Sequence, residues 1–441
     1  MKPKTPSREK QGNFLYQDLL EQLNPKHPLL VLAKKLPWTM FEKEFARFYA
    51  SVGRPAMPIR LMVGLLLLKQ IENLSDERVV DVWVQNPYYQ AFCGVEHFQW
   101  NQPCASSDLV HFRKRIGEAG VEKIFQASVA LHGKAGLERE VVIDTTVQEK
   151  NITFPTDTKL RVKVIRRCWK MAAKEGIQLR RSYRRELKKT LRVIRFSTKQ
   201  AEKKQVPAAR RRVKTMANAL LRDMVRKLPE KRLACLREEL EFYRRAVNQE
   251  RHDKNKIYSL HEPGVLCIAK GKEHKKYEFG SKAALAMTKT RCIIVGAKNY
   301  SENVYDGDTL SELLSQLKIV RGKPAEKAYC DRGFRGRKRI GDTEIVLPSA
   351  PVSTMSEYDK RKARKNFGRR SAIEPVIGHI KHDFRMIRNY LKGKVGDAIN
   401  LLLAAAAFNI KKWLKALAEG LLFALLFFCG LARQKEYNSA A

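Results

Sequence analysis

The stretch Val141-Val-Ile-Asp144 is an unbroken apolar run that ends on a carboxylate. A run of this kind, without polar alternation, is typical of a central strand buried on both faces of a sheet. Residues 1–135 before it show the apolar spacing of helices, so the sheet is expected to begin here. The pattern predicts that Asp144 stands at the carboxyl-terminal end of its strand.

Further strand signals follow along the chain. They are short apolar runs bounded by turn residues, at 265–268, 277–279, 292–296, 327–331 and 345–347. A helical stripe over 308–317 separates the third of these runs from the fourth. One strand, then a hairpin, then alternating helix and strand predict an α/β fold with a mixed sheet, consistent with a ribonuclease H-like core.

The chain carries a large positive charge, with 87 Lys and Arg against 46 Asp and Glu, a net charge of +41. A compact chain with this excess repels itself unless a polyanion neutralises it, and nucleic acid is the commonest such partner. Basic ribosomal and membrane-surface proteins share this imbalance. The charge therefore indicates a class of partner and no reaction.

Other compositional features indicate a cytoplasmic protein. The eight cysteines are spaced too widely for a Cys-x-x-Cys metal site or a dense disulfide framework, so we expect reduced thiols. No apolar segment follows the charges of the N-terminus, so no signal peptide is expected. The apolar run Leu421–Leu431 is roughly half of the ~20 residues that span a bilayer, so no stable membrane association is expected.

Three acidic residues stand in segments that one fold can bring together: Asp144, Asp331 and Glu374. Two aspartates that end apolar strands are neighbours if the strands pair, and a helix across that edge can deliver the glutamate. Hard cations such as Mg²⁺ prefer carboxylate oxygens and take further ligands from substrate phosphates. Two such ions, ~3.5–4 Å apart, promote phosphodiester cleavage. The three residues therefore predict a Mg²⁺ or Mn²⁺ site for phosphoryl transfer.

The segment around the third carboxylate has its own geometry. Arg370, Glu374 and Lys381 are spaced by four and seven residues, so they share one helical face with Phe367. That face presents a metal ligand flanked by two phosphate-binding cations. Pro375 favours another arrangement, a helix that begins just before it, in which Glu374 is a capping-box partner and Lys381 is solvated. The segment alone leaves both interpretations open.

Taken together, the three segments resemble the DDE transposases of bacterial insertion sequences. The likeness is greatest to the branch marked by Tyr-x2-Arg-x3-Glu-x6-Lys, which Phe367, Arg370, Glu374 and Lys381 match with Phe in place of the usual Tyr. Asp144 in Val-Ile-Asp-Thr-Thr and Asp331 in Cys-Asp-Arg-Gly-Phe-Arg-Gly are similar to the first and second aspartate motifs. The resemblance covers roughly residues 40–415.

The resemblance implies a transposase that cuts DNA at the ends of an element and joins the freed 3′-hydroxyl to target DNA. It implies Asp144, Asp331 and Glu374 as the catalytic and metal-binding residues. The residues expected to contact DNA are Phe367, Arg370 and Lys381, together with Arg332 and Arg335, which follow the second aspartate. The expected partner is double-stranded DNA, as terminal inverted repeats and target, bound by a homodimer at the bacterial nucleoid.

The chain then divides into five parts. We expect an N-terminal helical DNA-binding domain over 1–135, the first part of the catalytic core over 136–158, a basic helical insertion over 159–258, the rest of the core over 259–412, and an apolar C-terminal helix and tail over 413–441. The insertion is either a solvated helical hairpin or an arm that contacts DNA or another subunit, and its excess of arginine favours the arm.

Two other functions stay open, a non-catalytic nucleic-acid-binding protein such as a decayed transposase, and a related nuclease that cuts without joining. The remaining acidic residues near the motifs have simpler explanations. Asp157 is expected to be a turn residue and Glu149 a solvated strand residue. Asp306 and Asp308 are explained by turn and N-cap chemistry at the start of a helix.

Overall fold

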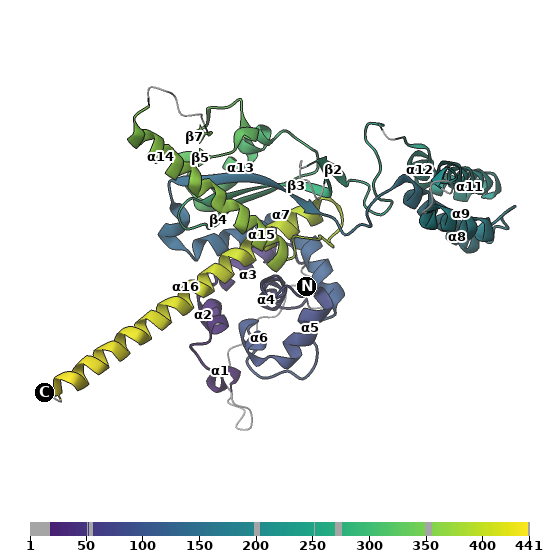
Figure 1. Ribbon diagram of the computed structural model, residues 1–441. Helices are drawn as coiled ribbons and strands as arrows, with labels where there is room; N and C mark the ends of the chain where they lie inside the picture. Colours follow the sequence, from purple (N-terminus) through teal and green to yellow (C-terminus); the bar gives the residue numbers. More distant parts are fainter. Residues whose placement is uncertain are drawn as a thin grey trace. The chain divides into compact units, whose positions relative to one another are not determined.

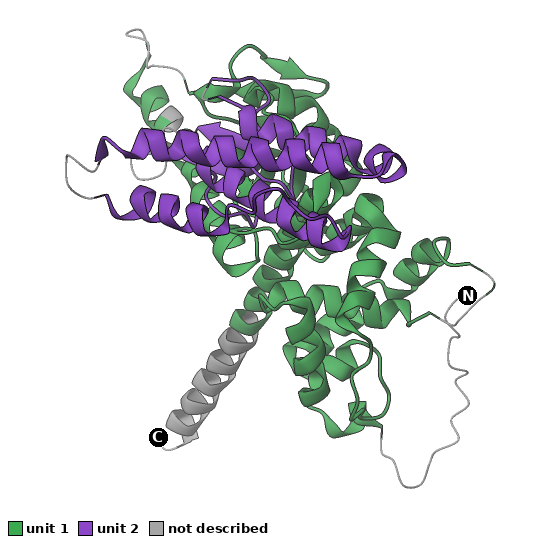
Figure 2. Ribbon diagram, turned by 90° about the vertical axis from the view of Figure 1, so that its right-hand side faces the viewer, with its two compact units in different colours: residues 1–149, 281–441 green, residues 150–280 purple. Residues whose placement is uncertain are grey.

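The computed structural model describes residues 18–50, 52, 56–197, 203–250, 252–269, 276–348 and 355–439, without the side chains of 362–363, 365–366 and 420–439. The chain forms two compact units (Figure 2). The first consists of Met1–Glu149 and Ser281–Ala441, and the second is Lys150–Gly280. The predicted insertion, 159–258, falls within the second unit.

The first unit contains the helices that precede the sheet and the greater part of the sheet (Figure 1). Its elements are α1 (Leu19–Gln22), α2 (Pro28–Lys35), α3 (Trp38–Ala46), α4 (Ile59–Ile71), α5 (Asp76–Gln85), α6 (Pro87–Phe92), α7 (Ser106–Ala130), η1 (Gly133–Leu137), β1 (Glu140–Glu149), β4 (Ile294–Tyr300), α13 (Asp306–Arg321), β5 (Lys327–Tyr329), η2 (Arg332–Phe334), β6 (Arg339–Ile340), β7 (Thr343–Val346), α14 (Glu357–Gly368), η3 (Arg369–Ala372), α15 (Ile373–Asp383) and α16 (Gly393–Ser439).

The sheet is mixed, which confirms the α/β fold class. Strand β3 (Tyr277–Thr288) runs from the second unit into the first, where the order of strands is β4-β3-β1-β5-β7-β6. β3 and β4 are antiparallel, whereas β5 pairs in parallel with both β1 and β7. Lys289 donates its backbone N–H to Glu140, and Lys150 donates to Phe279, so β1 and β3 run antiparallel.

β1 is longer than the sequence predicted, and Asp144 lies in the middle of it. The strand continues from Asp144 to Glu149, and the four residues after Asp144 are buried. Gln148 explains the extension, because its side chain donates to the carbonyl of Asp397 (2.9 Å) and accepts from Asn400 (2.8 Å). These bonds satisfy a buried amide that would otherwise be costly, so the expectation that the strand ends at Asp144 was wrong.

Helix α16 organises the core of the first unit. Its segment Leu401–Ala407 is fully buried and packs against α4, α7 and β4 (Figure 1). The buried amide of Asn409 bonds both backbone groups of Ile294, at 2.9 and 2.8 Å, which ties the helix to the first residue of β4. The N-terminal helices and the sheet therefore share one hydrophobic cluster. In the part of the chain searched, no helix is long and apolar enough to cross a membrane.

A buried charge cluster lies between the N-terminal helices. Ser75 caps α5 by accepting from the N–H of Arg78. Asp76 accepts two bonds from Arg113 (2.8 and 2.5 Å) and one from Lys69 (2.7 Å). Burial raises the pKa of Asp76, but the hydrogen bonds and charges of Arg113 and Lys69 outweigh it and lower this pKa to about 2.

In its described residues, the second unit is a bundle of four basic helices with a short β-hairpin arm. The helices are α8 (Asp157–Lys174), α9 (Arg184–Phe196), α11 (Val206–Lys227) and α12 (Glu230–Asn248), and they enclose a hydrophobic cluster of their own. The strand β2 (Leu266–Ala269) pairs in antiparallel register with Tyr277–Gly280 of β3. This unit holds 38 Lys and Arg against 14 Asp and Glu, a net charge of +24.

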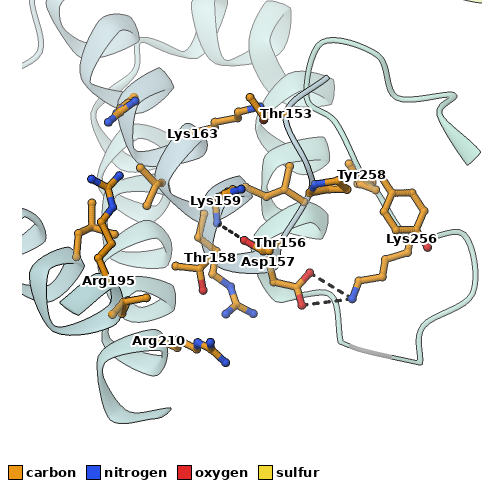
Figure 3. Close-up of a pocket in the computed structure, with 18 residues that line it drawn as sticks. Thr153, Thr156, Asp157, Thr158, Lys159, Lys163, Arg195, Arg210, Lys256 and Tyr258 are labelled. Carbon is orange, nitrogen blue, oxygen red and sulfur yellow. Dashed lines mark hydrogen bonds and ion pairs between the residues drawn. The ribbon is translucent and has the colours of Figure 1, made fainter. Parts of the chain in front are cut away.

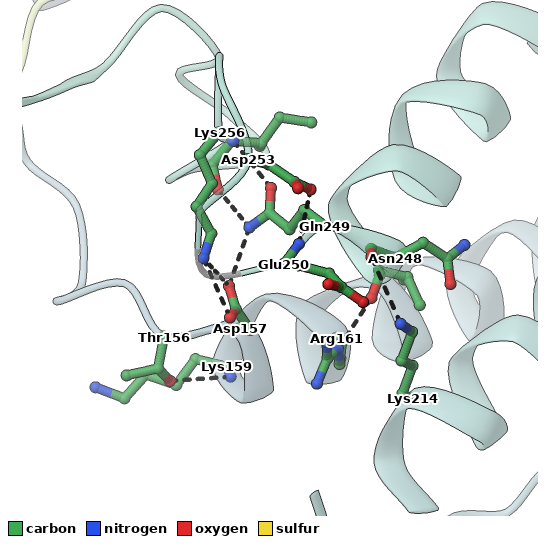
Figure 4. A network of polar contacts seen from close by, with 12 residues as sticks. Thr156, Asp157, Lys159, Arg161, Lys214, Asn248, Gln249, Glu250, Asp253 and Lys256 are labelled. Atoms are coloured by element: carbon green, nitrogen blue, oxygen red, sulfur yellow. Dashed lines mark hydrogen bonds and ion pairs between the residues drawn. The ribbon is translucent and has the colours of Figure 1, made fainter. Parts of the chain in front are cut away.

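A polar network fixes the connection that follows α12 (Figure 4). The amide of Gln249 bonds the N–H and the carbonyl of Ile257, at 2.9 and 3.0 Å, and donates to Asp157 at 3.1 Å. Lys256 pairs with the same carboxylate at 3.2 Å. Because these bonds close a loop of eight residues onto the start of α8, residues 256–258 are held against that helix.

Asp76→Asn is expected to lower the free energy of unfolding at pH 7 by about 3–5 kcal/mol. Its amide leaves Arg113 and Lys69, whose side chains are 4% and 8% exposed, without a counter-charge. The matched control Glu77→Gln, at an exposed neighbour, should change it by less than about 0.5 kcal/mol.

The effect of Asp76→Asn should also depend on pH in a defined direction. The Asp76 carboxyl has a pKa of about 2 in the folded protein and 3.8 in the unfolded chain. It therefore contributes stability that is present above pH 3.8 and is lost as the pH falls through about 2. Urea unfolding at pH 7 and between pH 4 and 2 measures this. A difference between wild type and variant that stays constant over this range would contradict the assignment.

Candidate active site across β1 and β5

The pairing of β1 with β5 brings two of the predicted acidic residues side by side. The parallel register matches Glu140 with Lys327 and Val142 with Tyr329. Continuing this register by two residues reaches Asp144 on one chain segment and Asp331 on the other, so the two carboxylates come from adjacent chain segments. β5 ends at Tyr329, so Asp144 lies beyond the paired part of the ladder.

Each aspartate is oriented by the backbone beside it. Oδ1 of Asp144 accepts the N–H of Thr145 at 2.7 Å. Oδ1 of Asp331 accepts the N–H of Gly333 at 2.7 Å, as the N-cap of η2. Hydrogen bonds to ionised carboxylates are stronger than those between neutral groups, and here each one fixes the direction of a side chain that is only partly buried.

The pKa of the Cys330 thiol is influenced by the charges of both aspartates. Burial raises the pKa of this thiol, the charges of Asp331 and Asp144 raise it further, and the charge of Arg370 opposes them. All three charged groups therefore lie near the same buried sulfur. Arg370, on the segment before α15, therefore contributes positive charge to the surroundings of this thiol.

Glu374 lies on α15, which packs against β1. Its carboxylate is 4.0 Å from the guanidinium of Arg370, and its side chain is 66% exposed. The alternative in which Glu374 closes a capping box is wrong, because the N-cap is Ala372 and no side chain caps the helix. The 3₁₀ segment Arg369–Ala372 separates α14 from α15. Phe367 lies on α14 and Arg370 in the 3₁₀ segment, so the prediction that both share one α-helix with Glu374 and Lys381 was wrong.

The predicted DNA-contacting residues lie in the same chain segments as Asp331 and Glu374, and they differ in how deeply they are buried. Phe367 packs its ring edge-to-face on Tyr329 of β5, with ring centres 6.0 Å apart. Arg332 and Arg335 are exposed in the segment that follows Asp331. Lys381 lies about two turns beyond Glu374 on α15 and is partly buried.

Sequence analysis missed the role of Asp306. Tyr305, not an aspartate, is the N-cap of α13, so the explanation of Asp306 as a helix cap was wrong. Oδ1 of Asp306 accepts from the hydroxyl of Thr145 at 2.9 Å and pairs with Lys282 at 2.6 Å. The residue therefore contacts the neighbour of Asp144, 161 positions earlier in the chain.

The start of α13 also contacts the segment after Asp331. A Cβ built on Gly333 would lie 2.9 Å from Oδ1 of Asp331 and 3.2 Å from Oδ2 of Asp306, so this glycine separates the two carboxylates. The hydroxyl of Tyr305 donates to the carbonyl of Arg335 at 3.2 Å. Asp308 pairs with Arg337 at 2.7 Å, which also differs from the capping role expected of it. A side chain at position 333 would require the carboxylate of Asp331 to shift.

The donor chemistry of the three predicted ligands suits a hard divalent cation, because all are carboxylates. The structure makes Asp144 and Asp331 neighbours and places Glu374 on the helix against β1. Among the residues described, however, no three His, Cys, Asp or Glu side chains converge closely enough to hold one metal ion. The three carboxylates therefore suit a divalent cation in their chemistry and in their placement on the strands and the helix.

Two family models of known proteins match parts of the chain. Residues 17–115 match the family model described as "Transposase domain (DUF772)", and residues 260–410 match "Transposase DDE domain". A Rhizobium meliloti protein, "Uncharacterized protein ORF8 in nfe locus", is 45% identical over 195 residues, which cover 43% of this chain and 93% of that protein. No solved structure matches the chain.

Asp306→Asn should lower the free energy of unfolding by about 1–3 kcal/mol. The amide keeps an acceptor for Thr145 but removes the charge that offsets Lys282, whose side chain is 10% exposed. Asp308→Asn is the matched control on the same turn, where the partner Arg337 is 43% exposed, and a loss below about 1 kcal/mol is expected. Urea denaturation compares them, and equal losses would show that Asp306 acts only as a surface residue.

Proposed function

We propose that this chain, which belongs to the same family as the Rhizobium meliloti protein and carries a transposase DDE domain, is a DNA transposase of a bacterial insertion sequence. It cuts at the ends of the element and joins the freed 3′-hydroxyl to target DNA. The observation that carries the proposal is the β1–β5 register, which sets Asp144 beside Asp331 next to the helix that bears Glu374.

The strand arrangement supports a ribonuclease H-like core. Three antiparallel strands, β4, β3 and β1, are followed by β5 and β7, which extend the sheet in parallel. This is the layout that a strand, a hairpin and then alternating helix and strand predict for such a core. The spacing of Arg370, Glu374 and Lys381 further supports the branch with the Tyr-x2-Arg-x3-Glu-x6-Lys signature.

In this proposal Asp144, Asp331 and Glu374 hold Mg²⁺ or Mn²⁺. A bound divalent ion supplies activation of the attacking oxygen and stabilisation of the charge on the leaving oxygen. The protein's own contribution is orientation: Thr145 and Gly333 direct the aspartates, and Asp306 holds Thr145.

Cations around the acidic residues bind the DNA backbone. Arg370, within 4.0 Å of Glu374, and Lys381 on the same helix are placed to bind the phosphates that flank the cleaved bond. Arg332 and Arg335 are exposed after Asp331 and are assigned to neighbouring phosphates. Phe367, half-buried against Tyr329, borders the DNA with the exposed part of its ring.

The partner in this proposal is double-stranded DNA, both as the terminal inverted repeats of the element and as the target. The chain acts on it as a homodimer, in the cytoplasm at the bacterial nucleoid. A net charge of +41 supports a polyanionic partner.

Asp144→Asn, Asp331→Asn and Glu374→Gln should each abolish cleavage, because each removes a metal-binding charge while leaving most DNA-binding cations in place. The substrate is a plasmid that carries the chain's own gene with its flanking DNA. Cleaved and joined products are measured by gel electrophoresis in Mg²⁺, and DNA affinity by a shift assay. Substantial cleavage by any one variant would remove that residue from the site, and cleaved DNA without joined DNA would identify a nuclease.

Arg370→Ala and Lys381→Ala should each slow single-turnover cleavage by about 10- to 1000-fold, since a charge aimed at the transition state is worth roughly 2–4 kcal/mol. Overall DNA affinity should change little, because many cations share it. Arg369→Ala, an exposed arginine on the same 3₁₀ turn, is the control and should change the rate less than about threefold. Rates equal to wild type in both test variants would refute the phosphate-binding role.

A further inference from the structure

The second unit contains a pocket that the proposed chemistry does not use (Figure 3). It has a volume of about 770 Å³ and lies between the start of α8, the end of α9 and the loop after α12. This volume is within the range of pockets that hold small organic ligands, roughly 300–1,000 Å³. Every residue that lines it belongs to the second unit.

The rim of the pocket is strongly positive. Seven of its lining residues are Lys or Arg and one is an aspartate. Lys159, Lys163 and Arg166 are spaced by four and three residues, so they form one stripe along α8. Like charges at this spacing destabilise a helix, and the pKa of Lys163 is lowered by burial and by the charge of Lys159.

Most of these charges have no counter-charge among the described residues. In the described part of the chain, no carboxylate pairs with Lys163, Arg166, Arg195 or Arg210. The one acidic lining residue, Asp157, is already held by Lys256 at 3.2 Å and by Gln249 at 3.1 Å (Figure 4). The rim therefore has an unmatched positive charge that an external anion can satisfy.

The floor of the pocket is apolar. Leu191 and Ile194 of α9 are partly exposed there, and the buried Ile257 and the half-buried Tyr258 form the opposite wall. The network around Gln249 fixes this wall against α8. An apolar floor within a cationic rim does not match a duplex, whose bases are stacked inside. It matches a single strand, whose base faces are open and whose phosphates follow the edge.

We infer that the pocket between α8 and α9 binds single-stranded nucleic acid, with unpaired bases on the Leu191 and Ile194 floor and phosphates on Lys163, Arg166, Arg195 and Arg210. This goes beyond the proposed function, because it concerns a strand-binding site in the second unit and requires no metal. A strand bound there leaves the charge of Asp157 paired with Lys256, so no carboxylate of the rim opposes the phosphates.

The test uses the full chain in EDTA, so that no cleavage takes place, with a labelled thirty-residue oligothymidylate and a duplex of equal length. The variant Arg166→Gln, Arg195→Gln, Arg210→Gln removes three rim charges from exposed residues that form no ion pair with any described residue. The control Lys170→Gln, Arg185→Gln, Lys231→Gln removes three exposed charges from α8, α9 and α12 of the same unit, outside the pocket. Both variants have the same net charge.

The rim variant should bind the oligothymidylate about 10- to 100-fold more weakly at 0.1 M salt. Its log–log salt slope should be shallower by about 2, since each single-strand phosphate contact contributes about 0.7. The control should lose less than about threefold, and the rim variant should lose less for the duplex than for the strand. Equal losses in the two variants, or a larger loss for the duplex, would overturn the inference.

Photo-crosslinking with bromodeoxyuridine gives a second measurement that does not depend on the variants. Mass spectrometry of wild-type protein should locate crosslinks at residues 191–195 and 256–258. Crosslinks confined to other parts of the chain would overturn the inference even if affinities fell as expected. Unchanged thermal unfolding of both triple variants shows that the folded structure is being compared.

Discussion

The parallel pairing of β1 with β5 is the constraint on which the acidic site depends. Only three residues of β5 belong to the strand, so the ladder needs support from side chains. Tyr329 supplies it. Its hydroxyl donates to Glu140 at 3.2 Å, Lys289 lies 3.8 Å from its ring centre and also pairs with Glu140, and Phe367 packs on it. One side chain thus fastens β5 to β1 and to α14.

The acidic groups collect where the rest of the chain is basic, and cations hold them together. Asp306 is next to Lys282 and to the turn of Asp331, while Glu374 is near Arg370. Carboxylates so close repel each other in a partly buried site, and each fixed cation reduces that cost. Because Lys282 also donates to the carbonyl of Val304 at 2.5 Å, its position is set by the backbone. Lys282 therefore holds Asp306 in a position that the backbone defines.

Much of this arrangement could be predicted from sequence because its signals are local. Apolar runs located β1, β4, β5 and β7, and the cap at Ser75 was visible in four residues. The length of β1 was not predictable, since Thr145–Gln148 contains three polar residues and one valine and so resembles an exposed segment. Only the fold brings Asp397 and Asn400, from the far end of the chain, to Gln148. The prediction for Asp306 was wrong for the same reason. Its sequence context suits a helix cap, and only the fold brings it to Thr145.

Charge divides unevenly between the two units. The second unit carries +24 in 131 residues, which leaves +17 of the total of +41 for the 310 residues of the first. The proposed carboxylate site lies in the less positive unit, where a bound cation would meet less repulsion from its surroundings. The long helices of the more positive unit leave their basic faces solvated. The proposed chemistry and the larger share of the positive charge therefore lie in different units, so substitutions in the second unit can weaken the attraction to a polyanion and leave the carboxylates in place.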